Sequence, residues 1–193
     1  MRRQQDRWQA VDVVAVADEP GRRAAASSKR CQRCGEKLLE LQRFRVTVRN
    51  GDTVDDQIVC PVCARVAELR RDGVAPRRVL IVDDDPIYRD VTRRWIEMTG
   101  VAEVIGFASD GKDAHGQIAR TAPDTIVLDM LMPRATGDQL LTELPADLDV
   151  VVVSASEPMR EEAIRLRPDA LVLDKRTTSF DRLVRHLAGL ATT

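Results

Sequence analysis

Short apolar runs alternate with amphipathic stretches through the second half of the chain. Predominantly apolar runs of four to seven residues lie at 78–82, 102–108, 125–129, 150–153 and 170–173. Stretches with helical spacing of apolar residues follow them at 87–100, 112–120, 138–144, 159–166 and 180–190. An apolar run this short is typical of a strand buried on both faces of a parallel sheet. The pattern predicts an α/β fold, a doubly wound, flavodoxin-like, five-stranded parallel sheet in the order 2-1-3-4-5.

The first half of the chain is more polar and predicts a smaller module. Residues 1–29 are rich in Arg, Ala and Ser, and we expect them to be mostly disordered. The short apolar run 11–16 leaves open an edge strand in this segment. Further on, a strand-like run at 44–48 and a second, polar strand flank Asn50-Gly51, which suits a hairpin turn.

All four cysteines lie in this first half, in two Cys-x-x-Cys pairs with 25 residues between them. The pairs are Cys31 with Cys34 and Cys60 with Cys63, and the second pair opens a helical stretch. Four thiolates form a closed tetrahedral shell for a structural Zn²⁺ ion, and the hairpin would bring the two pairs together. A first cysteine pair in a tight turn, a hairpin, and a second pair at the start of a helix together resemble a treble-clef or zinc-ribbon finger.

Two disulfides or a redox-active pair are the alternatives for these cysteines. No apolar run approaches the roughly 20 residues that span a bilayer, and the N-terminus lacks an apolar signal core, so we expect a cytoplasmic protein without a membrane partner. Clustered cysteines in that compartment favour a metal over disulfides. A catalytic zinc is less favoured, because both histidines, His115 and His186, lie in the other half.

The net charge of −1 hides an asymmetry between two modules. Residues 1–76 hold 15 basic and 11 acidic side chains, a net of +4, whereas residues 77–193 hold 15 and 20, a net of −5. After the N-terminal segment, the sequence predicts a zinc-finger domain at 30–72, a linker at 73–76 and a second domain at 77–193. Basic residues of the finger could meet nucleic acid, an acidic protein face or water, and nucleic acid is the minority option because no aromatic ladder accompanies them. These residues are Arg30, Arg33, Lys37, Arg43, Arg45 and Arg49.

Five polar side chains follow the predicted strands directly or one residue later. They are Asp83, Asp84, Asp129, Ser154 and Lys175. Since the carboxyl ends of parallel strands meet at one edge of a sheet, we expect these side chains to converge there. Three carboxylates in one pocket repel unless a cation intervenes, and hard oxygen ligands suit Mg²⁺. A carboxylate nucleophile, a divalent cation, a hydroxyl and an ammonium are what phosphoryl transfer onto an acid needs.

At these residues the second domain resembles the CheY-like receiver domain of bacterial two-component response regulators. The shared pattern includes the double acid after the first strand, Asp-x-x-Met-Pro-x-x-x-Gly from Asp129 to Gly137, Ser154-Ala155 after the fourth strand and Lys175 after the fifth. The match extends over the full domain length.

The resemblance implies a role for each of these residues. Asp129 would be the phosphoacceptor, Asp84 a direct Mg²⁺ ligand and Asp83 a ligand through water. The backbone carbonyl of Leu131 would be a third protein ligand. Two further side chains would bind the phosphoryl oxygens: Ser154 and Lys175. The third acid of the triplet, Asp85, we expect to cap the following helix.

Some positions depart from the family pattern. Receivers commonly carry an aromatic residue three before the lysine and a proline directly after it, and here these are Val172 and Arg176. The aromatic switch is therefore absent, and a cis peptide after the lysine is disfavoured. We expect the chemistry to survive while signal transmission differs. In the receiver family, the residues two after the acceptor and two after the hydroxyl help to place or exclude the water that hydrolyses the acyl phosphate. Here they are Leu131 and Ser156, neither an amide nor an acid, so the resemblance implies slow autodephosphorylation.

The sequence thus predicts a phosphoaccepting response regulator rather than an enzyme. A sensor histidine kinase or phosphotransfer protein would supply the phosphoryl group, and an unknown downstream protein would contact the finger or the receiver surface, since we expect no further output domain. One alternative is a pseudo-receiver, an interaction module that works without phosphate. Another is a zinc-finger regulator that binds nucleic acid and is gated by its receiver. A haloacid-dehalogenase-type phosphatase is disfavoured, because its Asp-x-Asp pair is not found at 129–131.

Overall fold

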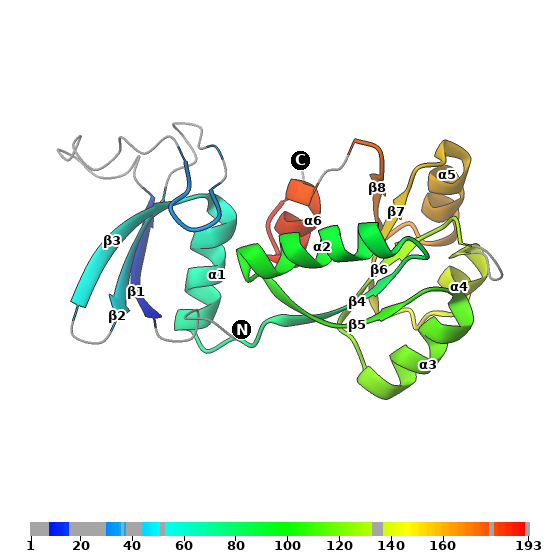
Figure 1. The fold of residues 1–193 in the computed structure, drawn as a ribbon, viewed down its shortest axis with the longest axis horizontal. Coiled ribbons are helices and arrows are strands. Elements are labelled where there is room, and N and C mark those ends of the chain that lie inside the picture. Colours follow the sequence, from blue (N-terminus) through cyan, green and yellow to red (C-terminus); the bar gives the residue numbers. More distant parts are fainter. Residues whose placement is uncertain are drawn as a thin grey trace. The chain divides into compact units, whose positions relative to one another are not determined.

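Two compact units make up the chain, with the main boundary between Pro76 and Arg77. The computed structural model describes residues 8–15, 30–35, 37, 44–50, 53–132, 137–177 and 180–191. Figure 1 labels the helices and strands of both units. Within these described ranges, no helix is long and apolar enough to cross a membrane.

The first unit is a three-stranded antiparallel sheet with one helix. Its strands are β1 (Trp8–Ala15), β2 (Phe44–Asn50) and β3 (Thr53–Val59), in the order β1-β2-β3. Helix α1 (Pro61–Arg71) packs against β1 and β2. Valine and isoleucine side chains of β2 and β3 and the apolar face of α1 form a small core. Its members include Val46, Val48, Ile58, Val59, Val62 and Val66.

One expectation for this unit is corrected by the structure. Residues 8–15 are not disordered but form β1, which pairs with β2 from Trp8↔Asn50 to Ala15↔Phe44. The alternative of an edge strand is therefore the right one for this stretch. The rest of 1–29 lies outside the described residues. The predicted hairpin of β2 and β3 is confirmed, since Asn50 pairs with Thr53 and leaves a two-residue connection.

The second unit contains the predicted five-stranded parallel sheet. Its strands are β4 (Arg77–Val82), β5 (Ala102–Ala108), β6 (Thr125–Asp129), β7 (Asp149–Ser154) and β8 (Leu171–Asp174). Their spatial order is β5-β4-β6-β7-β8, which confirms the order 2-1-3-4-5. Because β4 and β6 are neighbours, the segments that follow them begin side by side at the carboxyl edge of the sheet.

Helices cover both faces of this sheet. They are α2 (Pro86–Thr99), α3 (Gly111–Thr121), α4 (Gly137–Glu143), α5 (Glu157–Leu166) and α6 (Phe180–Leu187). Figure 1 shows α2 and α6 on one face and α3, α4 and α5 on the other. Alternate residues of the central strands pack under α3, α4 and α5, among them Leu80, Val82, Ile126, Leu128, Val150 and Val152. This two-sided burial explains why the strands are apolar without alternation.

Acidic side chains start two of these helices. Asp85 Oδ1 accepts a hydrogen bond from the Ile87 amide at 2.8 Å, so the predicted cap of α2 is confirmed. Asp110 does the same for α3 through the Asp113 amide at 2.9 Å. Gly137 is the first residue of α4, whereas Pro133, the proline of the Asp129–Gly137 pattern, lies outside the described residues.

Candidate functional site

Three carboxylates gather at the carboxyl edge of the five-stranded sheet. One oxygen each of Asp83, Asp84 and Asp129 lies within 4.8 Å of the others. Asp83 and Asp129 are 2% and 4% exposed, whereas Asp84 faces solvent. The predicted convergence of these acids is therefore present, with two buried members and one open member.

Lys175 joins the two buried acids. Its Nζ donates to Asp83 Oδ2 and to Asp129 Oδ2, each at 2.7 Å. The remaining oxygens accept from the backbone, Asp83 Oδ1 from the Asp85 amide at 2.8 Å and Asp129 Oδ1 from the Leu131 amide at 3.0 Å. Both carboxylates are thus fixed in orientation, with one ammonium between them.

Burial and charge act in opposite directions on these groups. Burial raises the pKa of Asp83 against the opposing hydrogen bonds from Lys175 and the Asp85 amide. Burial alone would lower the pKa of Lys175, but the hydrogen bonds to Asp129 and Asp83 outweigh it and raise that pKa. Lys175 is therefore an ammonium at neutral pH, and it offsets only part of the charge of the three-acid cluster.

Two further predicted residues border this cluster. Ser154 ends β7 next to β6, where Asp129 pairs with Val153, and its side chain is fully buried. Its Oγ accepts from the Ser156 amide at 3.3 Å. The Leu131 side chain is half exposed, and its amide contacts Asp129.

Gly137 gives the segment after β6 its close approach. A Cβ at this position would lie 2.6 Å from Met130 Cα and 2.8 Å from the Asp129 carbonyl oxygen. Its amide donates to the Met130 carbonyl at 3.3 Å. Any larger residue would press on the backbone at the strand end that carries Asp129, so only glycine allows this close approach beside the site.

The sequence did not predict the aromatic neighbour of Lys175. Tyr88, the one tyrosine of the chain, places its ring 4.3 Å from Lys175 Nζ. Its ring stacks on Phe180 of α6 at 6.1 Å, and Phe180 stacks on Trp95 at 5.4 Å. Burial, and then the charges of Asp83 and Asp129, raise the pKa of Tyr88, which stays a neutral phenol. The one signal in the sequence for this contact is that Tyr88 lies in the first turn of the helix that follows the acids.

Two positions that depart from the receiver pattern have clear surroundings. Val172 is half-buried and packs against the core beneath α3, α4 and α5. Arg176 is bound to Asp174 through its amide and its guanidinium. The described residues contain no cis peptide bond.

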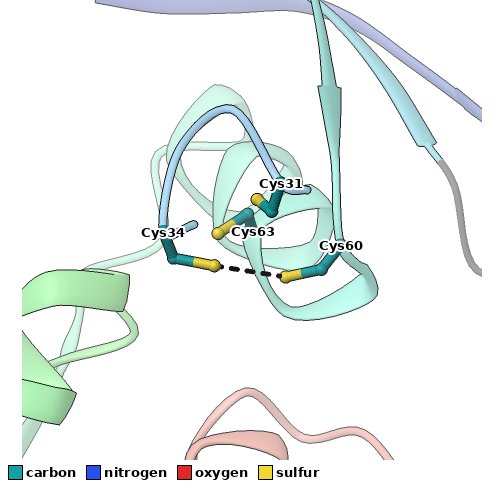
Figure 2. A group of neighbouring side chains, drawn as sticks. All are labelled: Cys31, Cys34, Cys60 and Cys63. Carbon is teal, nitrogen blue, oxygen red and sulfur yellow. Dashed lines mark hydrogen bonds between the residues drawn. The ribbon is translucent and has the colours of Figure 1, made fainter. Parts of the chain in front are cut away.

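The four cysteines of the first unit form a second cluster. Figure 2 shows their sulfurs turned toward one another. Cys31 and Cys34 come from the turn at residues 31–34, Cys60 lies directly before α1, and Cys63 lies in the first turn of α1. None of the four forms a disulfide bond, and their sulfurs all lie within 4.8 Å of one another. Cys34 Sγ and Cys60 Sγ are 3.8 Å apart. A tetrahedral ion with Zn–S bonds of about 2.3 Å separates its sulfurs by roughly 3.8 Å.

Comparison with known proteins points to one family for the second unit. The family profile described as "Response regulator receiver domain" matches residues 79–187. The response regulator MprA of Mycolicibacterium vanbaalenii is 35% identical over 94 residues, covering 47% of this chain and 40% of that protein. A protein-glutamate methylesterase/protein-glutamine glutaminase of Myxococcus xanthus is 36% identical over 111 residues, covering 55% of this chain and 32% of that protein.

A solved structure agrees with these matches. The signal receiver domain of NarL from Mycobacterium tuberculosis superimposes with a TM-score of 0.52 and 27% identity, covering 60% of this chain and 98% of that one. The chain spans less than half the length of the two curated relatives above.

Proposed function

The chain belongs to the response regulator receiver domain family, and from this premise we propose that it is a phosphoaccepting response regulator of two-component signalling. Asp129 is the proposed acceptor. The observation that carries this proposal is Lys175 Nζ, held 2.7 Å from both Asp83 and Asp129 beside the open Asp84. A buried, oriented carboxylate with an ammonium and further acids beside it suits phosphoryl transfer.

The acid cluster fits Mg²⁺. Asp83, Asp84 and Asp129 offer hard oxygen ligands, and their charges exceed that of the one ammonium between them. We assign Asp84 as a direct ligand, Asp83 as a ligand through water and the Leu131 carbonyl as a third protein ligand. When bound, Mg²⁺ would neutralise oxygens of the migrating phosphoryl group.

The remaining chemistry belongs to the protein. An oxygen of Asp129 attacks the phosphorus of a phosphohistidine on a kinase or phosphotransfer protein, so that a P–O bond forms as the P–N bond breaks. The bonding electron pair leaves with the histidine nitrogen. The Ser154 hydroxyl and the Lys175 ammonium donate hydrogen bonds to the phosphoryl oxygens on Asp129. The chain acts here as an acceptor rather than as an enzyme that turns over substrate.

For the first unit we propose a structural Zn²⁺ held by Cys31, Cys34, Cys60 and Cys63. The separation of Cys34 and Cys60 and the mutual approach of all four sulfurs support this assignment. Output to a downstream protein would then pass through this finger or through the receiver surface.

Phosphoryl transfer from acetyl phosphate tests the main proposal. With Mg²⁺, intact-mass spectrometry should detect one added phosphoryl group in the wild type and none in Asp129→Asn. Asp84→Asn should also fail, since loss of a metal ligand leaves the incoming phosphate facing uncompensated carboxylates.

Asp85→Asn is the matched control from the same acidic triplet. Asn caps a helix about as well as Asp, so this variant should be labelled like the wild type. Equal labelling of Asp129→Asn would place the acceptor elsewhere. An unlabelled wild type that still binds its partners would favour the pseudo-receiver.

A further inference from the structure

The carbonyl oxygen of Ser154, at the end of β7, receives two hydrogen bonds from other segments. The Lys175 amide donates to it at 3.1 Å, and Arg160 Nη1 donates at 3.0 Å from α5. Ser154, which carries the hydroxyl of the proposed site, is therefore held both by the residue after β8 and by helix α5.

The same guanidinium also contacts the segment that carries the site ammonium. Arg160 Nη2 lies 3.3 Å from Oδ2 of Asp174, the residue directly before Lys175. The two side chains are 17% and 20% exposed, so water and salt screen this pair less than a pair on the open surface. One arginine thus joins the ends of β7 and β8.

Asp174 in turn fixes the residue after the lysine. Its Oδ1 accepts from the amide and from Nε of Arg176 at 2.9 and 3.1 Å, and its Oδ2 accepts from Nη2 at 2.8 Å. This bonded loop stands where the receiver pattern has a proline. The two chain neighbours of Lys175 are therefore bound to each other, and Asp174 is also bound to Arg160.

We propose that Arg160 is a positioning residue for phosphoryl transfer: through Asp174 and the Ser154 carbonyl it sets the spacing of the Ser154 hydroxyl and the Lys175 ammonium. The inference rests on the proposed function, because it concerns the groups that would bind the phosphoryl oxygens. Displacing such groups by about 1 Å can cost on the order of 100-fold in rate. Loss of Arg160 should therefore affect the rate of labelling.

The backbone carbonyl of Asp83 is held in a similar way. Arg89 of α2 donates from Nη1 to the carbonyl oxygen of Asp83 at 2.5 Å. Arg89 and Arg160 each lie six residues after the residue whose carbonyl they bind. Two residues of the proposed site, Asp83 and Ser154, thus each accept a hydrogen bond at the backbone carbonyl from an arginine of the next helix.

The test measures the initial rate of labelling by acetyl phosphate and Mg²⁺ on the full chain, over a range of acetyl phosphate concentrations. Arg160→Met should lower the maximal rate by about 10- to 100-fold. Arg160→Lys should recover only part of it, because an ammonium cannot reproduce the two-sided contacts of a guanidinium. Arg165→Met, on the same helix but 73% exposed at its side chain, should match the wild type.

A double-mutant comparison separates positioning from a general loss of structure. In a Ser154→Ala background no hydroxyl is left to position, so Arg160→Met should slow labelling by a smaller factor than in the wild type. Equal factors in both backgrounds would overturn the proposal. Asp174→Asn, which keeps a side-chain acceptor but loses the ion pair, provides a second variant and should slow labelling in the same direction.

Two failures remain distinguishable in this design. If the wild type takes no label, the proposed function falls and the positioning role falls with it. If the wild type is labelled and folded Arg160→Met is labelled equally fast, only the positioning role is overturned.

Discussion

In the five-stranded unit the acidic residues of the site lie at the end of a buried strand or just beyond it, whereas in the three-stranded unit the cysteines are themselves part of the core. The apolar cluster beneath α3, α4 and α5 includes none of the site acids. By contrast, Cys31, Cys60 and Cys63 are 3%, 7% and 0% exposed and lie among the few buried residues of their unit. The receiver site is thus carried by a scaffold that exists without it, while the cysteine cluster is part of its own scaffold.

Metal removal should produce the largest difference in stability between the two units. Structural zinc supplies about 10–16 kcal/mol of folding free energy in finger peptides, more than a module of this size can replace by burial. Chelation or Cys60→Ser should therefore abolish amide-exchange protection in β2, β3 and α1, and leave β6 and β7 protected. Hydrogen-exchange mass spectrometry measures both regions in one sample.

Elemental analysis of unchelated protein provides the companion measurement, with one zinc expected per chain. Val54→Ser, at an exposed position of β3, is the matched control and should retain the metal. Substantially less than one zinc per chain, or full protection of the first unit after chelation, would contradict the assignment.

A glycine pair tests how tightly the receiver scaffold holds its site. Gly137→Ala should destabilise the five-stranded unit by roughly 1–3 kcal/mol, because its Cβ meets backbone atoms of Met130 and Asp129 that cannot rotate away. Gly116→Ala, within α3 and with no atom inside 4 Å of the added Cβ, should instead stabilise by about 0.5–1 kcal/mol. Urea unfolding of the two variants measures the difference, and equal effects would show that the loop yields easily.

Much of the receiver unit was predictable because its strands are buried on both faces. The unbroken apolar runs around Leu80, Ile126 and Val152 are typical of strands in a parallel sheet that helices cover on both faces. The parallel order then brought Asp83 and Asp129 to one edge, as the structure confirms. The cysteine spacing likewise predicted that the two pairs would meet, and they do.

The parts that sequence did not predict depend on partners distant in the chain. β1 mixes polar and apolar residues, and its strand conformation becomes clear only from its pairing with β2. The placement of Tyr88 over Lys175 depends on side-chain packing between α2 and α6. The reach of Arg160 to Asp174 depends on where α5 starts relative to β8. Hydrophobic periodicity contains none of these relationships.

The lifetime of the phosphoryl group should respond to the side chain beside the acceptor. Leu131 is half exposed and apolar, so it cannot hold a water in line with the acyl phosphate. Leu131→Asn should speed phosphate loss by up to about tenfold, which corresponds to about 1.4 kcal/mol. Phosphate release from labelled wild type and variant decides the point, and an unchanged or slower rate would show that bulk water reaches the acceptor without help. The finger variant Cys60→Ser should leave this rate unaltered.

The amino edge of the receiver sheet holds an ionic cluster whose effect should be smaller. Asp149 Oδ2 accepts from Arg77 Nη1 at 2.7 Å and from Thr125 Oγ1 at 2.9 Å, and His186 Nε2 lies 2.9 Å from Oδ1. Burial alone would raise the pKa of Asp149, but its hydrogen bond with His186 and the contacts with Thr125 and Arg77 outweigh it, and that pKa is lowered.

A carboxyl group with a lowered pKa in the folded state stabilises the fold when it is ionised. The contribution of Asp149 is therefore complete above the ordinary aspartate pKa of about 3.9, and it disappears as the pH falls from there through the lower pKa of the folded protein. Asp149→Asn should remove this part of the acid sensitivity of β7, with a cost near neutral pH of about 1 kcal/mol or less because the cluster is partly exposed. Zinc thiolates become protonated at higher pH than this, so the first unit should lose protection first as acid is added. Urea unfolding followed from pH 7 to pH 3 checks both expectations. If the free energy of unfolding of the variant depends on pH as that of the wild type does, Asp149 does not contribute to the acid sensitivity.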